Sequence, residues 1–402
     1  MIRTVDVLVV GAGPAGLAAA AGVAAAGVGR VEVLEREASA GGVPLHCARP
    51  GFGADPRGRA LDGPAYARRA VRAALRAGAA VRTGVSATGW AGPLTLEVTA
   101  PTGPERIRAR AVVLATGARE RPRSARLVPG TRPAGVLTTG ELQRTVARFG
   151  ARRALPGRRA VVVGGGPVAR AAVRTLREAG VAVAAVVTEL PGAAPLAGAT
   201  VPVLTGTVVT ELFGRGRPTG IAVRGADGRT GLLRCDTVVF TGDWIPDHEL
   251  VRSRGLPLAA GTRGPVTDAA FRTAGEGVFA VGNLLHGGEP ALRAAAEGRA
   301  VAGAVLARLA GAPWPAGGVP VAAAGSLRWV APGLLGAGAV PLLVRPERGL
   351  VRPVLTVRQD GAVLRSERLR GAVAPWRSVR LDGRWTEGVD PSGGPVVVDA
   401  GE

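Results

Sequence analysis

Short apolar runs followed by glycine-rich turns recur along this chain and predict strands that alternate with helices. Residues 7–10 are all apolar, which is typical of a short buried strand, and they lead into the turn 11–16 with the pattern G-x-G-x-x-G. A helix of small residues is expected over 14–26, and an apolar strand at 31–34 ends on Glu35. Strand, turn, helix, strand and acid in this order predict a nucleotide-binding βαβ unit.

Residues of this unit have distinct physical tasks in binding a dinucleotide. Gly11 allows the tight turn, Gly13 lets backbone N–H groups approach a pyrophosphate, and Gly16 lets the helix pack closely on the strand. The N-terminus of the helix faces the phosphate charge, and Glu35 can accept hydrogen bonds from a ribose. Because the chain has 62 glycines, the alternative is a glycine-rich turn in an ordinary βαβ unit.

The same pattern recurs in the middle of the chain. A strand at 159–163 leads into a glycine-rich turn, a helix over 168–179 and a strand at 181–187. Ala169 replaces the third glycine, and Thr188 stands where the spacing of the first copy would place its acid. The unit either binds a second nucleotide or is a structural βαβ unit that no longer does so.

Further elements follow these two units. The apolar strands within 111–117 and 278–283 both end in small residues, which suit the ligand-binding edge of a parallel sheet. A long alanine-rich helix is expected over 290–309, a Pro- and Gly-rich linker over 311–318, and short β-like runs over 319–402.

Four local expectations can be compared with the structure. The pattern predicts a helix over 139–149, strands at 201–210 and 232–240, and a hairpin turn at 359–361. Cys235 falls inside the expected strand 232–240 and is interpreted as structural.

Composition allows a large core and disfavours several classes of protein. The chain has 402 residues, of which 47% are hydrophobic, and a formal net charge of +21. Two or three domains are expected for this length. All 51 basic residues are arginine and lie scattered along the chain, which suits anionic partners such as nucleotides but does not favour a nucleic-acid-binding tail.

Cysteine usage limits the chemistry further. Cys47 and Cys235 are the two cysteines, which excludes a disulfide scaffold, a four-cysteine zinc site and a cysteine-ligated iron–sulfur cluster held by this chain alone. No metal site is expected. Neither a signal peptide nor an apolar run of membrane-spanning length is apparent, so a cytoplasmic location is the expectation.

Three residues are candidates for catalysis. Cys47 could be a redox thiol or a buried, inert side chain, and its neighbour His46 could transfer protons or be a loop residue satisfied by the backbone. His286 follows the small residues at 282–283 and has the same two interpretations.

Together these motifs resemble the two-dinucleotide-fold flavoproteins of the pyridine nucleotide-disulfide oxidoreductase superfamily. The resemblance covers about residues 5–309 and implies an FAD site and an NAD(P) site. The implied FAD residues are Gly11, Gly13, Ala15, Gly16, Glu35, Gly41, Gly42, Ala115, Thr116, Gly117, Gly282 and Asn283, with Asn283 in place of the family's Asp. The implied NAD(P) residues are Gly164, Gly166 and Ala169.

The fold that this resemblance implies is α/β, with two Rossmann-like dinucleotide-binding domains and a small C-terminal β domain. The FAD domain would be split by an inserted NAD(P)-type domain. The expected boundaries are 1–122 and 246–312 for the two parts of the FAD domain, 123–245 for the linker and NAD(P)-type domain, and 319–402 for the β domain.

One departure from the superfamily is the missing redox disulfide, since the chain contains neither C-x-x-C nor C-x4-C. Two narrower similarities are present. Residues 135–143 resemble the FAD subunits of hydrogen cyanide synthase, opine oxidase and hydroxyproline dehydrogenase. Segments between 41 and 67 look like flavoproteins of glycerol-phosphate dehydrogenase systems. The former subunits oxidise C–N bonds with partner chains, so the similarity implies a partner oxidoreductase or iron–sulfur subunit.

The expected function is that of an FAD-dependent oxidoreductase without a redox-active disulfide. It would move electrons between a small-molecule donor and an acceptor or partner subunit, the donor being NAD(P)H or an amine or hydroxy-acid substrate. Two alternatives stay open. One is a non-catalytic FAD-binding scaffold subunit, and the other is an FAD-dependent RNA-modifying enzyme, suggested by the positive charge alone.

Overall fold

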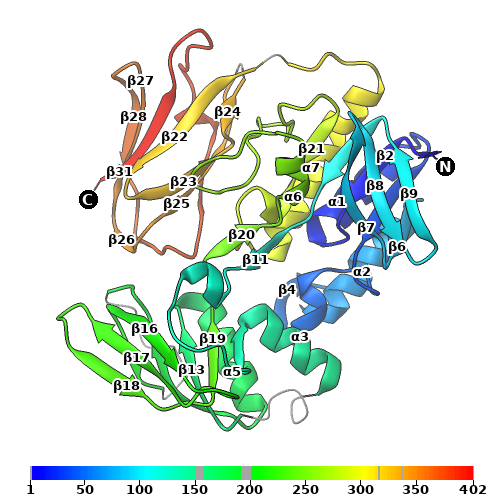
Figure 1. Ribbon diagram of the computed structural model, residues 1–402. Coiled ribbons are helices and arrows are strands. Elements are labelled where there is room, and N and C mark those ends of the chain that lie inside the picture. Colours follow the sequence, from blue (N-terminus) through cyan, green and yellow to red (C-terminus); the bar gives the residue numbers. More distant parts are fainter. Residues whose placement is uncertain (1, 151–156, 192–200, 316, 337, 402) are drawn as a thin grey trace. The chain divides into compact units, whose positions relative to one another are not determined.

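The structure, a computed structural model, describes residues 2–150, 157–191, 201–315, 317–336 and 338–401 (Figure 1). The chain forms two compact units, one made of Met1–Ala118 with Pro246–Glu402 and the other of Arg119–Ile245. Strands β11 (Ala118–Glu120) and β20 (Trp244–Pro246) pair with each other and contain the two points where the chain passes between the units. The four-segment division expected from the sequence stays a prediction.

A five-stranded parallel sheet forms the centre of the first unit, in the order β21-β10-β2-β3-β6. Alternate residues of its central strand face opposite sides, so that Val7 and Val9 join one apolar cluster while Leu8 and Val10 join another. The strands are β2 (Val7–Val10), β3 (Val31–Glu35), β6 (Ala80–Thr83), β10 (Ala111–Leu114) and β21 (Val278–Ala280).

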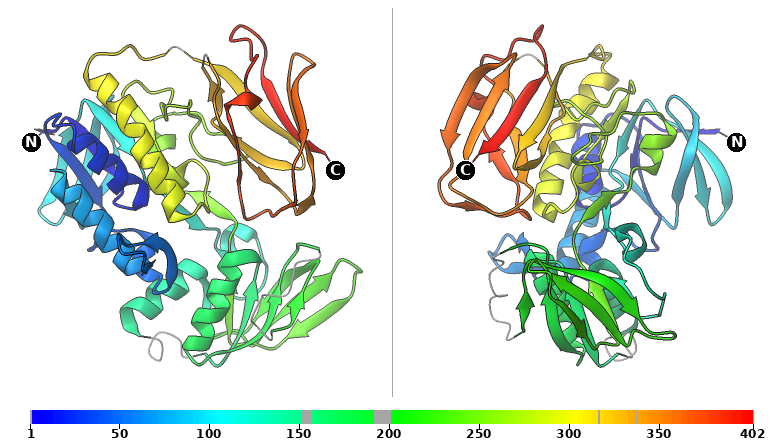
Figure 2. Two further views of the ribbon diagram at one scale, coloured as in Figure 1. Left: turned by 180° about the vertical axis from the view of Figure 1, so that it is seen from behind. Right: turned by 60° about the vertical axis from the view of Figure 1, so that its left-hand side comes forward.

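Helices cover one face of this sheet and a mostly antiparallel sheet covers the other (Figure 2). The helices are α1 (Pro14–Ala24), α2 (Gly63–Arg76) and α7 (Ala291–Leu309). The second sheet has the order β1-β9-β8-β7, with β1 (Ile2–Thr4), β7 (Ser86–Gly92), β8 (Thr95–Ala100) and β9 (Gly103–Arg108). Smaller elements of this part are the 3-10 helices η1 (Val43–His46) and η3 (Gly282–Leu284), the hairpin β4 (Pro50–Ala54) and β5 (Ala60–Asp62), and α6 (Glu249–Ser253).

The second unit repeats the parallel arrangement, with strands in the order β12-β19-β13-β14-β15. These are β12 (Val136–Thr138), β13 (Arg159–Val163), β14 (Ala182–Val187), β15 (Val203–Leu204) and β19 (Thr237–Phe240). It also contains η2 (Arg123–Arg126), α3 (Thr139–Phe149), α5 (Gly166–Glu178) and the antiparallel strands β16 (Thr207–Phe213), β17 (Gly220–Gly225) and β18 (Thr230–Leu233). The expected α/β class, with two parallel sheets, is confirmed.

The C-terminal strands, here called the C-terminal module (described residues 319–401), pack around an apolar core of their own. Its sheets have the orders β24-β22-β31-β27-β28, β23-β25-β30 and β26-β29. The elements are β22 (Val319–Gly325), β23 (Leu327–Ala331), β24 (Leu334–Leu335), β25 (Leu342–Pro346), β26 (Leu350–Val351), β27 (Val354–Gln359), β28 (Ala362–Arg368), β29 (Ala372–Val373), β30 (Val379–Leu381), η4 (Gly383–Trp385) and β31 (Val396–Gly401).

Several local expectations hold and two are wrong. Asp360 and Gly361 both have positive φ, as the two central residues of a tight hairpin turn require, and they join β27 to β28. The strand expected at 201–210 is split, because Gly206 turns the chain at a φ of 56°. Cys235 lies between β18 and β19 instead of inside a strand, and the adjacent Asp236 side chain accepts hydrogen bonds from the backbone N–H groups of residues 158 and 159.

Candidate functional site

Two of the three motif glycines in the turn between β2 and α1 could not be replaced by a larger residue without a clash. Gly11 has a φ of 105°, and a Cβ added there would overlap the carbonyl oxygen of Ala115. A Cβ at Gly16 would overlap the carbonyl oxygen of Gly11. Gly13 differs, because nothing lies within 4 Å of where its Cβ would be. Gly11 and Gly16 are therefore required by the fold itself, whereas Gly13 borders open space.

Glu35, at the end of β3, forms a hydrogen bond with the backbone of this turn. Its Oε2 accepts a hydrogen bond from the N–H of Ala12 at 3.1 Å, and its Oε1 accepts one from the N–H of Glu37 at 2.9 Å. Burial raises the pKa of Glu35, and the two backbone hydrogen bonds lower it by less, so that the pKa is raised overall. A buried carboxylate thus stands next to the glycine turn, as the sequence pattern predicts.

Two other sequence motifs meet the same turn. The N–H of Gly41 donates to the carbonyl oxygen of Ala12 at 2.9 Å, and a Cβ at Gly42 would lie 2.9 Å from the Cα of Gly13. A Cβ at Gly282 would lie 2.6 Å from the Cβ of Ala15. Segments from different parts of the sequence therefore converge on the first turn of α1.

The small residues after β10 complete the edge of the sheet. Ala115 adjoins Gly11, and the hydroxyl of Thr116 donates to the carbonyl oxygen of Asp247 at 2.7 Å. The carbonyl oxygen of Gly117 accepts a hydrogen bond from the N–H of Asp247 at 2.9 Å. These contacts fix Thr116 and Gly117 beside the glycine turn.

The residues present fit the ADP part of a dinucleotide. Helix α1 begins at Pro14, directly after Gly13, with no side-chain cap and no acidic residue in its first turn. Its first N–H groups can therefore receive a phosphate, and Gly13 leaves room for it. The carboxylate of Glu35 lies at the end of the neighbouring strand, where a ribose would be bound.

His46 and Cys47 lie on and just after η1, the short helix that follows Gly42. His46 is half-buried and Cys47 is buried, with its Sγ donating to the carbonyl oxygen of Val43 at 3.6 Å. Burial raises the pKa of the Cys47 thiol, although the charge of Arg49 opposes this. The thiol is therefore predominantly protonated at neutral pH, which disfavours nucleophilic chemistry.

His286 is buried, with 3% of its surface exposed. Its Nε2 lies 3.2 Å from Oε1 of Glu297, and its ring stacks on that of Trp329 with centroids 5.2 Å apart. Burial by itself lowers the pKa of His286, but the charge and hydrogen bond of Glu297 raise it by more, with a further contribution from Glu289. This environment suits an internal, paired imidazole more than one that meets a substrate directly.

Gly282 and Asn283 are both held by polar contacts. The N–H of Gly282 donates to Oε2 of Glu297 at 3.0 Å. The Asn283 amide bonds both backbone groups of Glu289. Its Nδ2 donates to the carbonyl oxygen of Glu289 at 3.2 Å, and its Oδ1 accepts from the N–H of Glu289 at 2.9 Å. Sequence reasoning missed Glu289 and Glu297, whose only signal is an acid within an otherwise alanine-rich segment.

In the second unit the glycine turn is kept but the acid is not. Gly164 has a φ of 125°, and its N–H donates to the carbonyl oxygen of Val187 at 2.7 Å. Gly166 also has positive φ, while Ala169 is fully buried in the local core, where its methyl group fits. Thr188 follows directly on Val187, and its hydroxyl accepts a hydrogen bond from the N–H of residue 190 at 3.3 Å.

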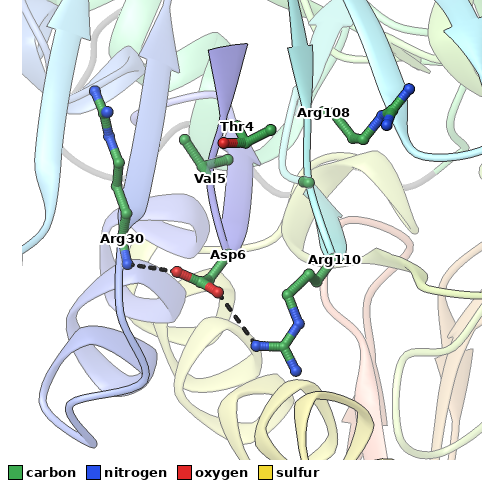
Figure 3. A pocket seen from close by; sticks show the side chains of 7 residues that line it. Thr4, Val5, Asp6, Arg30, Arg108 and Arg110 are labelled. Atoms are coloured by element: carbon green, nitrogen blue, oxygen red, sulfur yellow. Dashed lines mark hydrogen bonds and ion pairs between the residues drawn. The ribbon is translucent and has the colours of Figure 1, made fainter. Parts of the chain in front are cut away.

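A separate hollow of about 230 Å³ lies at the opposite end of the first parallel sheet (Figure 3). Asp6 occupies it, accepting a hydrogen bond from the N–H of Arg30 at 2.8 Å and pairing with Arg110 at 3.2 Å. Its remaining lining residues are Thr4, Val5, Arg108 and Ala109. These residues precede β2 and β10, whereas nucleotides bind where parallel strands end. The hollow is therefore not part of the glycine-turn site.

A family model described as pyridine nucleotide-disulphide oxidoreductase matches residues 5–298. The chain belongs to this family. Its members are FAD-dependent oxidoreductases that bind FAD and NAD(P), so the expected enzyme class and cofactors are confirmed.

One curated relative and several solved structures are similar to this oxidoreductase. An opine oxidase subunit of Agrobacterium tumefaciens (strain Ach5) is 36% identical over 186 residues, which cover 44% of this chain and 35% of the relative. The match thus spans about a third of the relative's length.

Three solved structures show the same fold. Thioredoxin reductase of T. acidophilum superimposes with a TM-score of 0.58 at 23% identity, over 75% of this chain and 98% of its own. The L-proline dehydrogenase of P. horikoshii gives 0.57 at 19% identity, over 77% and 57%. An NAD-dependent persulfide reductase of A. fulgidus gives 0.59 at 19% identity, over 88% and 68%.

Two further observations concern the whole described part of this oxidoreductase. Among the residues that the structure describes, no cluster of His, Cys, Asp and Glu side chains is suited to a metal ion. None of the described helices is both long and apolar enough to cross a membrane.

Proposed function

We propose that this oxidoreductase binds FAD at the glycine turn of its first unit, oxidises a small amine- or hydroxy-acid substrate there, and passes the electrons to a partner chain. We choose such a substrate over NAD(P)H as the electron donor because of the contrast between Glu35 and Thr188. The carboxylate beside the first glycine turn accepts two backbone N–H groups and keeps further acceptor capacity, whereas a neutral threonine hydroxyl stands beside the second. The first turn therefore has the group that holds a ribose, and the second lacks it.

The route by which electrons leave is limited by the cysteines. The chain has two, Cys47 and Cys235, and both are buried and outside any disulfide. Burial raises the pKa of each thiol, that of Cys235 to about 11. Because they are 188 positions apart in the sequence and no C-x-x-C is present, they do not form the dithiol motif of a disulfide reductase. This supports transfer of electrons to an acceptor outside the chain.

The similarity to the opine oxidase chain supports both the substrate class and the partner. An opine contains a secondary amine between two carboxylate-bearing carbons, so oxidation would remove two electrons from its C–N bond. The relative is named as one subunit of its enzyme, which supports a partner chain as the electron acceptor. Because the match spans only about a third of that relative, substrate and partner are proposals for this chain.

In this proposal the residues of the first unit bind and orient the cofactor. Helix α1 places its N-terminal N–H groups at the pyrophosphate, Gly13 allows the approach, and Glu35 accepts hydrogen bonds from the ribose. Bound FAD supplies an isoalloxazine ring that accepts two electrons and passes them on. The turn that contains Gly282 and Asn283 adjoins Ala15 and is fixed by Glu297.

The test is anaerobic reduction of the FAD-loaded chain, followed by flavin absorbance in a stopped-flow instrument. The reductants are opines, proline derivatives, glycerol 3-phosphate, NADH and NADPH. We expect an amine- or hydroxy-acid to bleach the flavin faster than either pyridine nucleotide at equal concentration. Faster bleaching by NADH or NADPH would reverse the choice of donor, and no bleaching by any reductant would support the scaffold role instead.

Reduction by NAD(P)H is the second candidate, and one observation favours it. Gly164 keeps the positive φ of its counterpart Gly11, and α5 begins without a side-chain cap. Its N-terminus could therefore receive a pyrophosphate even though the acid is absent.

A further inference from the structure

Two chains of contacts run from the C-terminal module to the turn that contains Gly282 and Asn283. In the first, Trp329 of β23 stacks on His286 with an interplanar angle of 14°. The Nε2 of His286 lies 3.2 Å from one carboxylate oxygen of Glu297, and the other oxygen accepts the N–H of Gly282 at 3.0 Å. A side chain of the module thus reaches the Gly282 backbone through two intermediates.

The second chain of contacts runs through a buried ion pair. Arg345 of β25 donates to the carboxylate of Glu289 and, at 2.9 Å, to the carbonyl oxygen of Gly287. The hydroxyl of Ser378 donates to the same carboxylate at 2.9 Å. The backbone of Glu289 is in turn held by both ends of the Asn283 amide.

The two series of contacts are connected to each other within the module. The guanidinium carbon of Arg345 lies 5.0 Å from the ring centroid of Trp329, the same ring that stacks on His286. The two series of contacts are also connected at the turn, because Gly282 and Asn283 are consecutive. The orientation of this turn is therefore set from two sides by side chains of the C-terminal module.

Stability of the module alone does not account for this arrangement. The module has its own apolar core, which includes Leu355, Val357 and Val398. Arg345 and Glu289 have side-chain exposures of 7% and 2%, and burying such a pair gains little over apolar packing. Burial lowers the pKa of Arg345, and the charge of Glu289 opposes that effect. Among the described residues, Nε of Arg345 and Nδ1 of His286 have no hydrogen-bond partner, but the remaining polar contacts of this buried network are directional and favour one geometry.

We propose that Trp329 and Arg345 are positioning residues for FAD, through which the C-terminal module holds the turn at Gly282 and Asn283 in the geometry that binds the cofactor. This inference rests on the proposed binding of FAD at the first unit. It assigns the module a role in cofactor binding, although no module residue belongs to the glycine turn or adjoins it in the sequence.

The test compares Trp329→Leu with Trp385→Leu in the full chain. Trp385 is a matched control, because it is also 4% exposed in the module and also lies under an arginine, Arg365, at 5.4 Å. For each variant, the FAD dissociation constant is measured by fluorescence and the midpoint of thermal unfolding is measured separately. We expect Trp329→Leu to weaken FAD binding roughly tenfold more than Trp385→Leu at a similar loss of thermal stability.

A second pair of variants covers the case in which Trp329→Leu does not fold. Trp329→Phe keeps an aromatic ring on His286 and should hold FAD within about twofold of wild type. The double variant Arg345→Met, Glu289→Gln removes both charges of the buried pair and should weaken FAD binding roughly tenfold. Arg293, the other ion-pair partner of Glu289, is 33% exposed and therefore stays solvated in this variant.

The outcomes separate this inference from the proposed function. A wild-type chain that binds no FAD overturns both. A wild-type chain that binds FAD no more tightly than the Arg345→Met, Glu289→Gln variant overturns the positioning role alone, as do equal affinities of the two leucine variants.

Discussion

Glu35 and Thr188 occupy the same position in the two nucleotide-binding units of this chain. In the first unit Val10 pairs with Leu34, and Glu35 comes next. In the second, Val163 pairs with Val187, and Thr188 comes next. The register of the strands agrees with the spacing in the sequence: both identify Thr188 as the counterpart of the acid and place Glu189 one residue beyond it.

Replacing Glu35 by Gln should weaken FAD binding by roughly tenfold or more. The amide cannot accept from Ala12, Glu37 and a ribose as the carboxylate can, and a hydrogen bond to a charged group contributes about 1.5–3 kcal/mol. The affinity is measured by FAD fluorescence. Thr188→Val is the matched control in the second unit and should leave FAD affinity unchanged. Equal losses in the two variants would contradict the assignment of FAD to the first unit.

Gly13→Ala should fold normally and still bind FAD poorly. Gly13 has a φ of −80°, which alanine adopts readily, and its Cβ would meet no protein atom within 4 Å. The methyl group would instead occupy the space through which a pyrophosphate approaches, so we expect a loss of roughly tenfold in affinity at nearly unchanged thermal stability.

Two other glycines provide the controls for that variant. Gly16→Ala should destabilise the fold by about 1–3 kcal/mol, because its methyl group would overlap the carbonyl oxygen of Gly11. Gly303→Ala, exposed in α7 with open space around it, should stabilise the chain by about 0.5–1 kcal/mol and leave FAD binding intact. Tight FAD binding by Gly13→Ala would contradict the proposed site.

The His286 pair makes stability depend on pH in a definite direction. Its pKa is raised in the folded chain, so its contribution is fully present below about pH 6.5 and is lost as pH rises through the raised folded value. The charged groups around it are Glu297 and Glu289, and Glu289 is itself paired with Arg345 and Arg293.

This dependence is measured as the difference in unfolding free energy between wild type and His286→Gln across pH 6 to 9. We expect the advantage of wild type to shrink with rising pH. His248→Gln is the control, because His248 bonds the carbonyl oxygen of Arg263 and has no part in this network. An advantage that grows with pH would show that the imidazole is neutral in the folded chain.

Both thiols should react slowly with Ellman's reagent in the native chain at pH 8. Cys47 and Cys235 are 8% and 4% exposed, and burial raises the pKa of each, which reduces the thiolate fraction. We expect two thiols to react once the chain is unfolded, and Cys47→Ser to keep flavin reduction by substrate. Rapid labelling of Cys47 with loss of flavin reduction would identify it as catalytic, and Cys235→Ser serves as the control.

The sequence predicted those elements whose cause is local. Helix α3 has the expected bounds because Thr138 and Glu141 form a reciprocal capping box that sets its first turn. The strands β2 and β10 were predicted because each is a short, wholly apolar run, and Gly11 and Gly16 because they stand in the local pattern G-x-G-x-x-G. These patterns depend on neighbours in the sequence.

The remainder depends on contacts between distant residues. Nothing near Trp329 or Arg345 in the sequence indicates that they meet His286 and Glu289. The break at Cys235 arises because Asp236 bonds backbone N–H groups 77 and 78 positions away. Such contacts follow from the packing of elements, and periodicity does not encode them.

The most direct test of this account is the amount of FAD in the purified chain, measured by absorbance and by fluorescence after heat release. The account predicts about one FAD per chain, held by the turn at Gly11 to Gly16, with none at the turn that begins at Gly164. A chain that carries no flavin, or one that binds two, would contradict it.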